Sequence, residues 1–265
     1  MGQLGETLSE SIRKTIALWR TFDAATQAEL DALDSDQEIE DRFYRDLEFG
    51  TGGLRGVMGA GTNRMNRYTV RRATRGLADY LLAAAADQAE SAGPARTAAE
   101  PVAVAVAYDS RLNSADFAAQ TAQVLCAAGI RTYLFDQIVP TPVLSFAVRH
   151  FGCSAGVVIT ASHNPKAYNG YKVYDPQGCQ LIPVLADQVI ARVNAVTDYA
   201  AIPVADLAQA QASGLLISVG SEVLERAAEV EESTRSVRAA LATRIGAAPD
   251  IAQALRDAIG TLAHA

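Results

Sequence analysis

The sequence is poor in cysteine, histidine and aromatic residues. Of its 265 residues, 3 are cysteine, 3 are histidine and 6% are aromatic. Cys126, Cys153 and Cys179 are an odd number at wide spacings, which fits neither a disulfide framework nor a zinc site. We therefore expect reduced, buried thiols, as in a cytoplasmic protein.

Long apolar runs and a surplus of positive charge are also missing. No run approaches the roughly 18 apolar residues of a membrane-spanning helix, and the N-terminus has no apolar signal core. The net charge is −7, whereas nucleic-acid-binding domains usually carry a basic surface. We expect neither a membrane nor a nucleic-acid partner. Local arginines and lysines would have to attract any phosphorylated ligand, because the overall charge repels it.

Strands and helices alternate through the middle of the sequence. The apolar runs 102–106 and 155–159 predict buried parallel strands, and 131–135 predicts a third. Apolar residues at helical spacing predict the helices, which cover about 70–86, 114–128, 141–150 and 183–193. This alternation is typical of an α/β fold with a mostly parallel or mixed sheet sandwiched by helices.

Segments without predicted strands flank this region. Ile12 and Ile16 predict an amphipathic helix over the first ~20 residues, and a second polar helix is expected to end at about Tyr44. Two alanine-rich helices are expected after Gly220, either folded over the sheet or, as a sharper alternative, mediating self-association. The expected divisions are a helical extension at 1–45, an α/β domain at 46–220 and a divergent helical tail at 221–265.

The most informative motif is Thr160-Ala161-Ser162-His163-Asn164-Pro165, which follows the strand predicted at 155–159. Ligands of open α/β sheets lie at the carboxyl ends of the strands, and proline forces the chain to leave the sheet here. Asn169-Gly170 then predicts a tight turn, and residues 171–174 alternate like a half-buried strand that carries Lys172. An ordinary surface loop is the alternative.

Ser162 is a candidate phosphoryl carrier. A serine hydroxyl is a poor nucleophile without an adjacent base, and adjacent side chains on an extended chain point to opposite sides. We therefore expect no direct dyad between Ser162 and His163. A phosphoserine carries about −1.5 to −2 charge, and its transfer needs positioning and charge neutralisation.

Two further segments carry chemistry-bearing residues. The glycine-rich block 50–61, which contains Arg55, is expected to lack regular structure, and it lacks the Gly-Lys-Ser/Thr ending of a nucleotide-binding loop. Asp109 and Arg111 follow the strand predicted at 102–107 and are expected to form a structural ion pair. The alternatives are a surface arginine for Arg55 and a solvated edge-strand lysine for Lys172.

Together these segments resemble the α-D-phosphohexomutases, the phosphoglucomutase and phosphomannomutase family. The resemblance rests on 160–165 with 169–172, on the block 47–66 and on Tyr108-Asp109-Ser110-Arg111. With the helical extension before it, the sequence is most similar to the bacterial phosphoglucomutase branch that includes phosphopentomutase-like enzymes. The resemblance covers roughly the first 220 residues and implies the family's first domain.

The resemblance implies an isomerase that moves a phosphoryl group within hexose phosphates, with a sugar bisphosphate as activator. Ser162 would be the phosphoserine. Lys172 and Arg55 would flank the transferred group and bind phosphate, whereas His163 and Asn164 would shape the loop and hydrogen-bond around the phosphate.

The family resemblance also implies a magnesium ion, held by the phosphoserine and by an Asp-x-Asp-x-Asp loop of a second domain. That loop is missing after Asp175, so the expected metal contact is Ser162 through its phosphate. The family's later domains are not recognised either. We therefore expect a truncation or a reading-frame change near Arg226, and little mutase turnover by this chain alone. A non-catalytic remnant or phospho-sugar-binding module of the same fold is the alternative.

Overall fold

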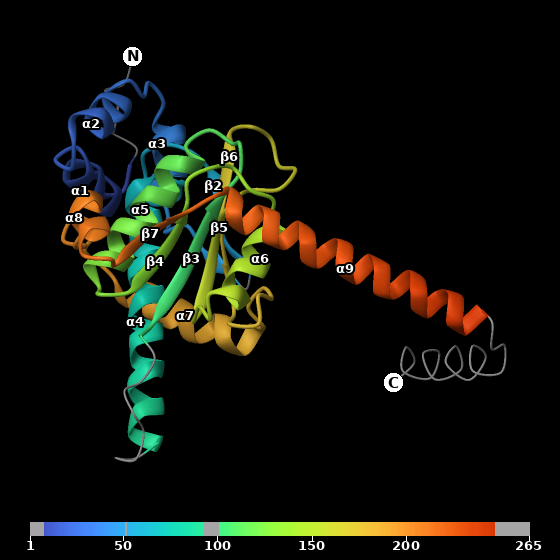
Figure 1. The fold of residues 1–265 in the computed structure, drawn as a ribbon. Helices are drawn as coiled ribbons and strands as arrows, with labels where there is room; N and C mark the ends of the chain where they lie inside the picture. The colour runs from blue at the N-terminus through green and yellow to red at the C-terminus, as the bar shows by residue number, and fades with distance from the viewer. Residues whose placement is uncertain (1–7, 51, 93–100, 247–265) are drawn as a thin grey trace. The chain divides into compact units, whose positions relative to one another are not determined.

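The computed structural model describes residues 8–50, 52–92 and 101–246 (Figure 1). The chain divides into two compact units, Met1–Gly220 and Ser221–Ala265. Among the described residues, no helix combines the length and the apolar character needed to cross a membrane.

The described strands of the first unit form one seven-stranded mixed sheet in the order β1-β2-β6-β5-β3-β4-β7. The parallel strands are β3 (Ala103–Tyr108), β4 (Arg131–Phe135), β5 (Ala155–Ile159) and β7 (Leu216–Val219). The strands joined by antiparallel pairing are β1 (Phe49–Gly50), β2 (Gly53–Val57) and β6 (Tyr168–Tyr174), which pairs with β5. The expected mixed sheet is confirmed.

Helices cover both faces of this sheet (Figure 1). One face packs against α4 (Arg67–Ala92), α5 (Ser114–Ala127) and α7 (Pro183–Ala195) through a core that includes Val106, Val157 and Tyr171. The other face packs against α6 (Thr141–His150), whose Leu144 and Val148 lie over Gly156. The short α8 (Leu207–Ala212) packs beside α5 and β7. The α/β/α sandwich is therefore confirmed.

The helical extension contains α1 (Glu10–Trp19), α2 (Ala24–Asp31) and α3 (Asp36–Phe43). The prediction of one polar helix before Tyr44 is wrong, because Asp23 and Ser35 each accept a hydrogen bond from a backbone N–H and so begin separate helices. Trp19 is buried among the aromatic side chains Phe22, Phe43, Tyr68 and Tyr199. This aromatic cluster attaches the extension to the α/β body.

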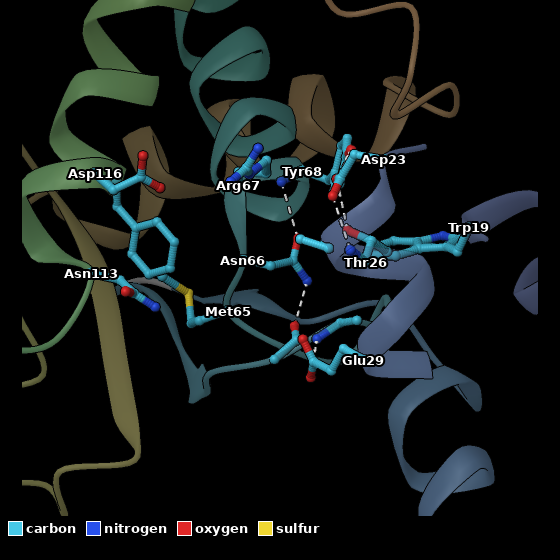
Figure 2. A pocket seen from close by; sticks show the side chains of 14 residues that line it. Trp19, Asp23, Thr26, Glu29, Met65, Asn66, Arg67, Tyr68, Asn113 and Asp116 are labelled. Carbon is cyan, nitrogen blue, oxygen red and sulfur yellow. Dashed lines mark hydrogen bonds between the residues drawn. The ribbon is translucent and has the colours of Figure 1, made fainter. Parts of the chain in front are cut away.

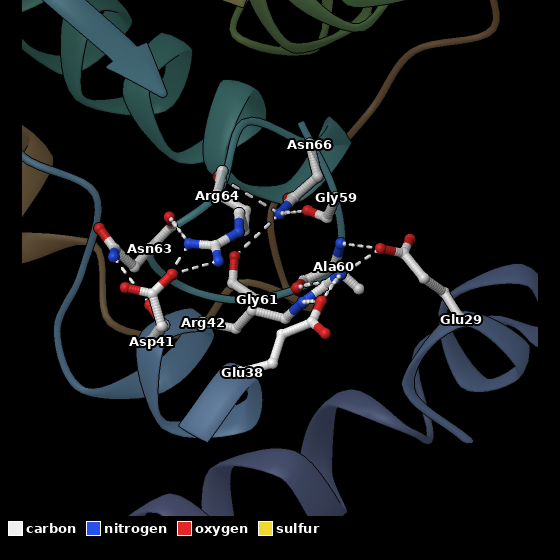
Figure 3. A network of polar contacts seen from close by, with 10 residues as sticks. All are labelled: Glu29, Glu38, Asp41, Arg42, Gly59, Ala60, Gly61, Asn63, Arg64 and Asn66. Carbon is white, nitrogen blue, oxygen red and sulfur yellow. Dashed lines mark hydrogen bonds and ion pairs between the residues drawn. The ribbon is translucent and has the colours of Figure 1, made fainter. Parts of the chain in front are cut away.

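A network of ion pairs and hydrogen bonds also attaches the extension to the loop that precedes α4 (Figure 3). Arg42 donates to Glu29 at 2.6 Å, to Glu38 at 2.8 Å and to the carbonyl of Ala60 at 3.1 Å. Glu29 in turn accepts from the Ala60 N–H at 2.9 Å. The network holds the loop in one conformation against α2 and α3.

Two glycine-containing segments form strands, although the sequence predicted irregular structure for one and a tight turn for the other. The block 50–61 is not without regular structure, because β2 pairs with β6 along 54–57. A Cβ at Gly53, where φ is +94°, would lie 1.9 Å from the carbonyl oxygen of Tyr171. Asn169-Gly170 is not a turn but part of β6, where Gly170 lets that strand approach Thr160 and Leu54. These glycines therefore permit close strand contact.

Three local features concern the start of α5, the end of α4 and one cysteine. Asn113 holds the N-cap position of α5 with φ 61°, while Ser114 Oγ donates to Asp109. The helix predicted at about 70–86 extends to Ala92 as α4, and residues 93–100 lie outside the described residues. Cys179 is exposed rather than buried, unlike Cys126 and Cys153.

The second unit contains α9 (Ser221–Gly246), which is the first of the two helices expected after Gly220. Exposed ion pairs stabilise it, among them Arg226 with Glu229 and Arg235 with Glu231. The second predicted helix of the tail lies outside the described residues. Self-association through these helices stays a prediction.

Candidate functional site

The Ser162 loop lies at the topological switch point of the parallel sheet. The connection from β3 to β4 runs through α5 on one face, whereas the connection from β4 to β5 runs through α6 on the other. The carboxyl ends of the adjacent strands β3 and β5 therefore border the crevice where α/β proteins bind ligands. The loops 109–113 and 160–167 begin there, and the N–H of Asp109 donates to the carbonyl of Ile159 at 3.1 Å.

Ser162 is exposed and adopts a left-handed backbone conformation, with φ 55°. A non-glycine residue pays about 1–2 kcal/mol for this conformation, and such strain is concentrated at functional sites. The conformation is supported locally, because the N–H of Ser162 donates to Thr160 Oγ1 at 3.0 Å. The hydroxyl is thereby presented at the protein surface.

Lys172 reaches Ser162 directly. Its Nζ donates to Ser162 Oγ at 2.8 Å, and the side chain is half-buried on β6. Burial lowers the pKa of Lys172, and the positive charge of Arg55 lowers it further, while Asp109 acts in the opposite direction. Lys172 does not lie on an edge strand, because β6 pairs with both β2 and β5.

Arg55 lies on the same side of the sheet as Lys172. On the antiparallel pair of β2 and β6, Arg55 is opposite Gly170, and residues two apart on a strand share a face. Arg55 is exposed, and within the described residues it has no hydrogen-bond or ion-pair partner. Two cations therefore lie on one face of the sheet: Lys172 donates to the Ser162 hydroxyl, and Arg55 is close enough to Lys172 to lower its pKa.

His163 and Asn164 contribute to the loop in different ways. His163 is exposed. The N–H of Asn164 donates to the carbonyl of Ala161 at 3.1 Å, which closes a tight turn around Ser162. The structure thus brings Lys172 into contact with Ser162, places Arg55 on the same face of the sheet as Lys172 and leaves His163 exposed to solvent.

Sequence reasoning missed the main role of Arg111. The expected ion pair with Asp109 exists, with 3.6 Å between Arg111 Nε and Asp109 Oδ2. The guanidinium also donates to four backbone carbonyls, at 2.6 Å to Ser162 and Asn164 and at 3.1 Å to Pro165 and Tyr168. These bonds are visible only in the structure, because they join two loops that are distant in the sequence. The position of Arg111 after a predicted strand was a sequence signal for a role at the site.

A separate hollow of about 290 Å³ lies between the helical extension and the start of α5 (Figure 2). Its polar side chains already have partners: Asp23 accepts from Tyr68 and Thr26, and Glu29 accepts from Ala60. Burial alone would raise the pKa of Asp23, but the bonds from Tyr68 and Thr26 lower it to about 2. These groups stabilise the fold.

The described residues do not form a metal-binding cluster. No group of three or more histidine, cysteine, aspartate or glutamate side chains within them is close enough to hold a metal ion. Asp109, directly after β3, accepts from the backbone of Arg111 and from Ser114. The charged side chains on the Lys172 face are the cations Lys172 and Arg55, which suit an anion.

Comparison with known proteins agrees with this geometry. Residues 46–200 match the family model described as phosphoglucomutase/phosphomannomutase, alpha/beta/alpha domain I. A Schizosaccharomyces pombe protein named "Probable phosphoribomutase" is 47% identical over 137 residues, which cover 52% of this chain and 22% of that protein. A phosphoglucomutase of Staphylococcus haemolyticus is 44% identical over 142 residues, which cover 54% of this chain and 23% of the relative.

A solved structure gives the same result. A protein from Thermus thermophilus, described as a phosphomannomutase, superposes with a TM-score of 0.51 at 27% identity. The superposition covers 66% of this chain and 33% of the other. The chain thus spans about a quarter to a third of the length of these relatives.

Proposed function

This chain belongs to the phosphoglucomutase/phosphomannomutase family, and we propose that it carries the phosphoryl-accepting serine of a phospho-sugar mutase. In this proposal Ser162 takes a phosphoryl group from a hexose bisphosphate and returns it to a hexose monophosphate. The observation that carries the proposal is the 2.8 Å hydrogen bond from Lys172 Nζ to Ser162 Oγ, at the switch point of the sheet.

The transfer joins Ser162 Oγ to phosphorus and breaks the bond between phosphorus and the sugar oxygen. The serine loses its hydroxyl proton and the sugar oxygen gains one. Lys172 stabilises the negative charge that develops on Oγ, because its ammonium already donates to that atom. Its lowered pKa also makes proton exchange with the hydroxyl easier than for an ordinary lysine.

Arg55 is the second cation of the proposed site. A chain of net charge −7 repels a phosphorylated sugar at long range, so binding depends on positive groups at the site. Arg55 lies on the Lys172 side of the sheet, and its guanidinium can bind two phosphate oxygens at once. His163 and Asn164 complete the proposed phosphate surroundings as loop residues.

The magnesium expected from the sequence resemblance does not fit the described residues of this chain. They contain no cluster of metal-ligating side chains, so the only ligand left to propose is the phosphate on Ser162. The matched relatives are named for ribose and for glucose phosphates.

The test is phosphoryl uptake from glucose 1,6-bisphosphate, followed by intact-mass spectrometry. We expect the chain to gain the mass of one phosphoryl group, and Ser162→Ala to gain none. Turnover of glucose 1-phosphate is expected to be very low, because positioning can supply about 7–11 kcal/mol of barrier reduction and each ~1.36 kcal/mol is tenfold in rate. Saturable binding of the bisphosphate without any gain in mass would contradict the proposal and support a binding module.

A further inference from the structure

Arg111 holds the whole serine loop through one guanidinium. Its Nη2 donates to the carbonyls of Ser162 and Asn164, and its Nη1 donates to those of Pro165 and Tyr168. The side chain is 14% exposed. The segment 162–168 therefore wraps around Arg111, and four of its carbonyl oxygens accept from the guanidinium.

Arg111 is itself held from both sides of the crevice. Asp109 accepts from the backbone N–H of Arg111 at 2.9 Å and from Ser114 Oγ at 2.8 Å. Ser114 Oγ also accepts from Asn169 Nδ2 at 3.0 Å, and Asn169 is fully buried in β6. The guanidinium is thus fixed to the end of β3, the start of α5 and the start of β6.

A cation beside a proposed phosphoserine would ordinarily be taken for a phosphate ligand. A guanidinium has five N–H donors, and four of those of Arg111 are bonded to loop carbonyls. The fifth, on Nε, faces Asp109. Binding a phosphate would require Arg111 to give up the bonds that shape the loop.

We propose that Arg111 is a positioning residue that keeps Ser162 in its left-handed conformation, with Oγ within reach of Lys172. This inference rests on the proposed function for its kinetic consequence, but its structural part is independent of it. Lysine cannot replace Arg111, because only the planar fork of arginine can bond four oxygens arranged around it.

The structural part is tested by tryptic cleavage after Lys166, which is exposed within the loop. Arg111→Ala and Arg111→Lys should be cut there at least about tenfold faster than wild type, as expected when loop opening costs ~1.4 kcal/mol less. Arg149→Ala is the matched control, because Arg149 donates to the carbonyl of Gln177 in a different turn. Unchanged cleavage in both Arg111 variants would overturn the proposal.

The kinetic part separates positioning from phosphate binding. We measure the rate of Ser162 phosphorylation against the concentration of glucose 1,6-bisphosphate. If Arg111 positions the serine, its variants should be phosphorylated at saturation about 100-fold more slowly than wild type, as for a misplacement near 1 Å. Their half-saturating concentration should stay within about twofold of the wild-type value. A raised half-saturating concentration with an unchanged saturated rate would overturn the proposal in favour of a phosphate ligand.

The two experiments distinguish failure of the inference from failure of the proposed function. A wild-type chain that takes up no phosphoryl group overturns the proposed function, and the cleavage comparison then decides alone whether Arg111 holds the loop. If Arg111→Ala does not fold, Arg111→Lys keeps the charge and serves in both measurements.

Discussion

Replacing Gly170 by alanine tests how closely the return strand fixes the serine loop. Gly170 is buried in β6, and an added Cβ would lie 2.6 Å from the carbonyl oxygen of Thr160. Ordinary contacts begin near 3.4 Å, so that oxygen would have to move by about 0.8 Å. Thr160 precedes Ser162 by two residues, and its N–H donates to the Gly170 carbonyl at 3.0 Å. The displacement therefore acts directly on the start of the loop.

The size of the effect follows from this displacement. Overpacking of this kind lowers the free energy of unfolding by about 1–3 kcal/mol, which leaves a folded protein. A shift near 1 Å also removes the 2.8 Å bond between Lys172 and Ser162, because a separation of 3.6 Å is no longer a hydrogen bond. Misplacement of about 1 Å typically costs 100-fold in rate. We expect phosphorylation of Ser162 in Gly170→Ala to slow by about that factor.

Urea unfolding and a time course of intact mass with glucose 1,6-bisphosphate measure the two effects. Gly50→Ala is the matched control: Gly50 lies in β1, its φ is not positive, and no atom lies within 4 Å of an added Cβ. If Gly170→Ala were as stable as Gly50→Ala and were phosphorylated at the wild-type rate, the contact between β6 and Thr160 would not position the serine.

Three further variants test the fold and the electrostatics. Gly53→Ala should lower the free energy of unfolding in urea by at least about 3 kcal/mol, because it adds a clash with β6 to a left-handed φ. In Tyr68→Phe, the free energy of unfolding should fall less between about pH 4 and pH 2 than it does in wild type. The lowered pKa of Asp23 contributes stability above pH 3.8 that disappears as the pH falls towards 2, and removing the Tyr68 bond reduces that contribution. Arg55→Ala should raise the pKa of Lys172, measured by competitive acetylation against pH, because a neighbouring positive charge is removed.

Each of these variants has its own control or contradicting outcome. Gly129→Ala shares a positive φ but has open space around the added Cβ, so it should cost only about 1–2 kcal/mol. An equal cost at both glycines would argue against close strand contact. An unchanged dependence of stability on pH in Tyr68→Phe would refute the assigned hydrogen bond. Arg192→Ala, on exposed α7 surface, should leave the pKa of Lys172 unchanged, and the same result in Arg55→Ala would remove Arg55 from the site.

Much of the sheet could be predicted from the sequence, because its central strands are continuous apolar runs. The predicted bounds of β4, 131–135, are those observed, since the strand lies between a glycine-ended helix and a polar loop. The edge strand β7 was missed because Leu216–Val219 is short and follows a polar stretch. The glycines of β2 and β6 were misinterpreted because their purpose, contact between strands distant in sequence, is not a local property.

The candidate site was also only partly predictable from the sequence. The contact between Lys172 and Ser162 could be predicted, because strand ends, alternating hydrophobicity and the family resemblance can all be read from the sequence. Arg111 could not, because its bonds join residues 51 to 57 positions apart. The left-handed conformation of Ser162 likewise has no sequence signature of its own, and we propose that it depends in part on these non-local bonds.

The role of Ser162 is tested most directly by peptide mapping by mass spectrometry of the chain after incubation with glucose 1,6-bisphosphate. We expect one phosphoryl group, located on Ser162, whose amount falls sharply in Lys172→Met. Phosphate on any other residue while Ser162 stays unmodified would contradict that role.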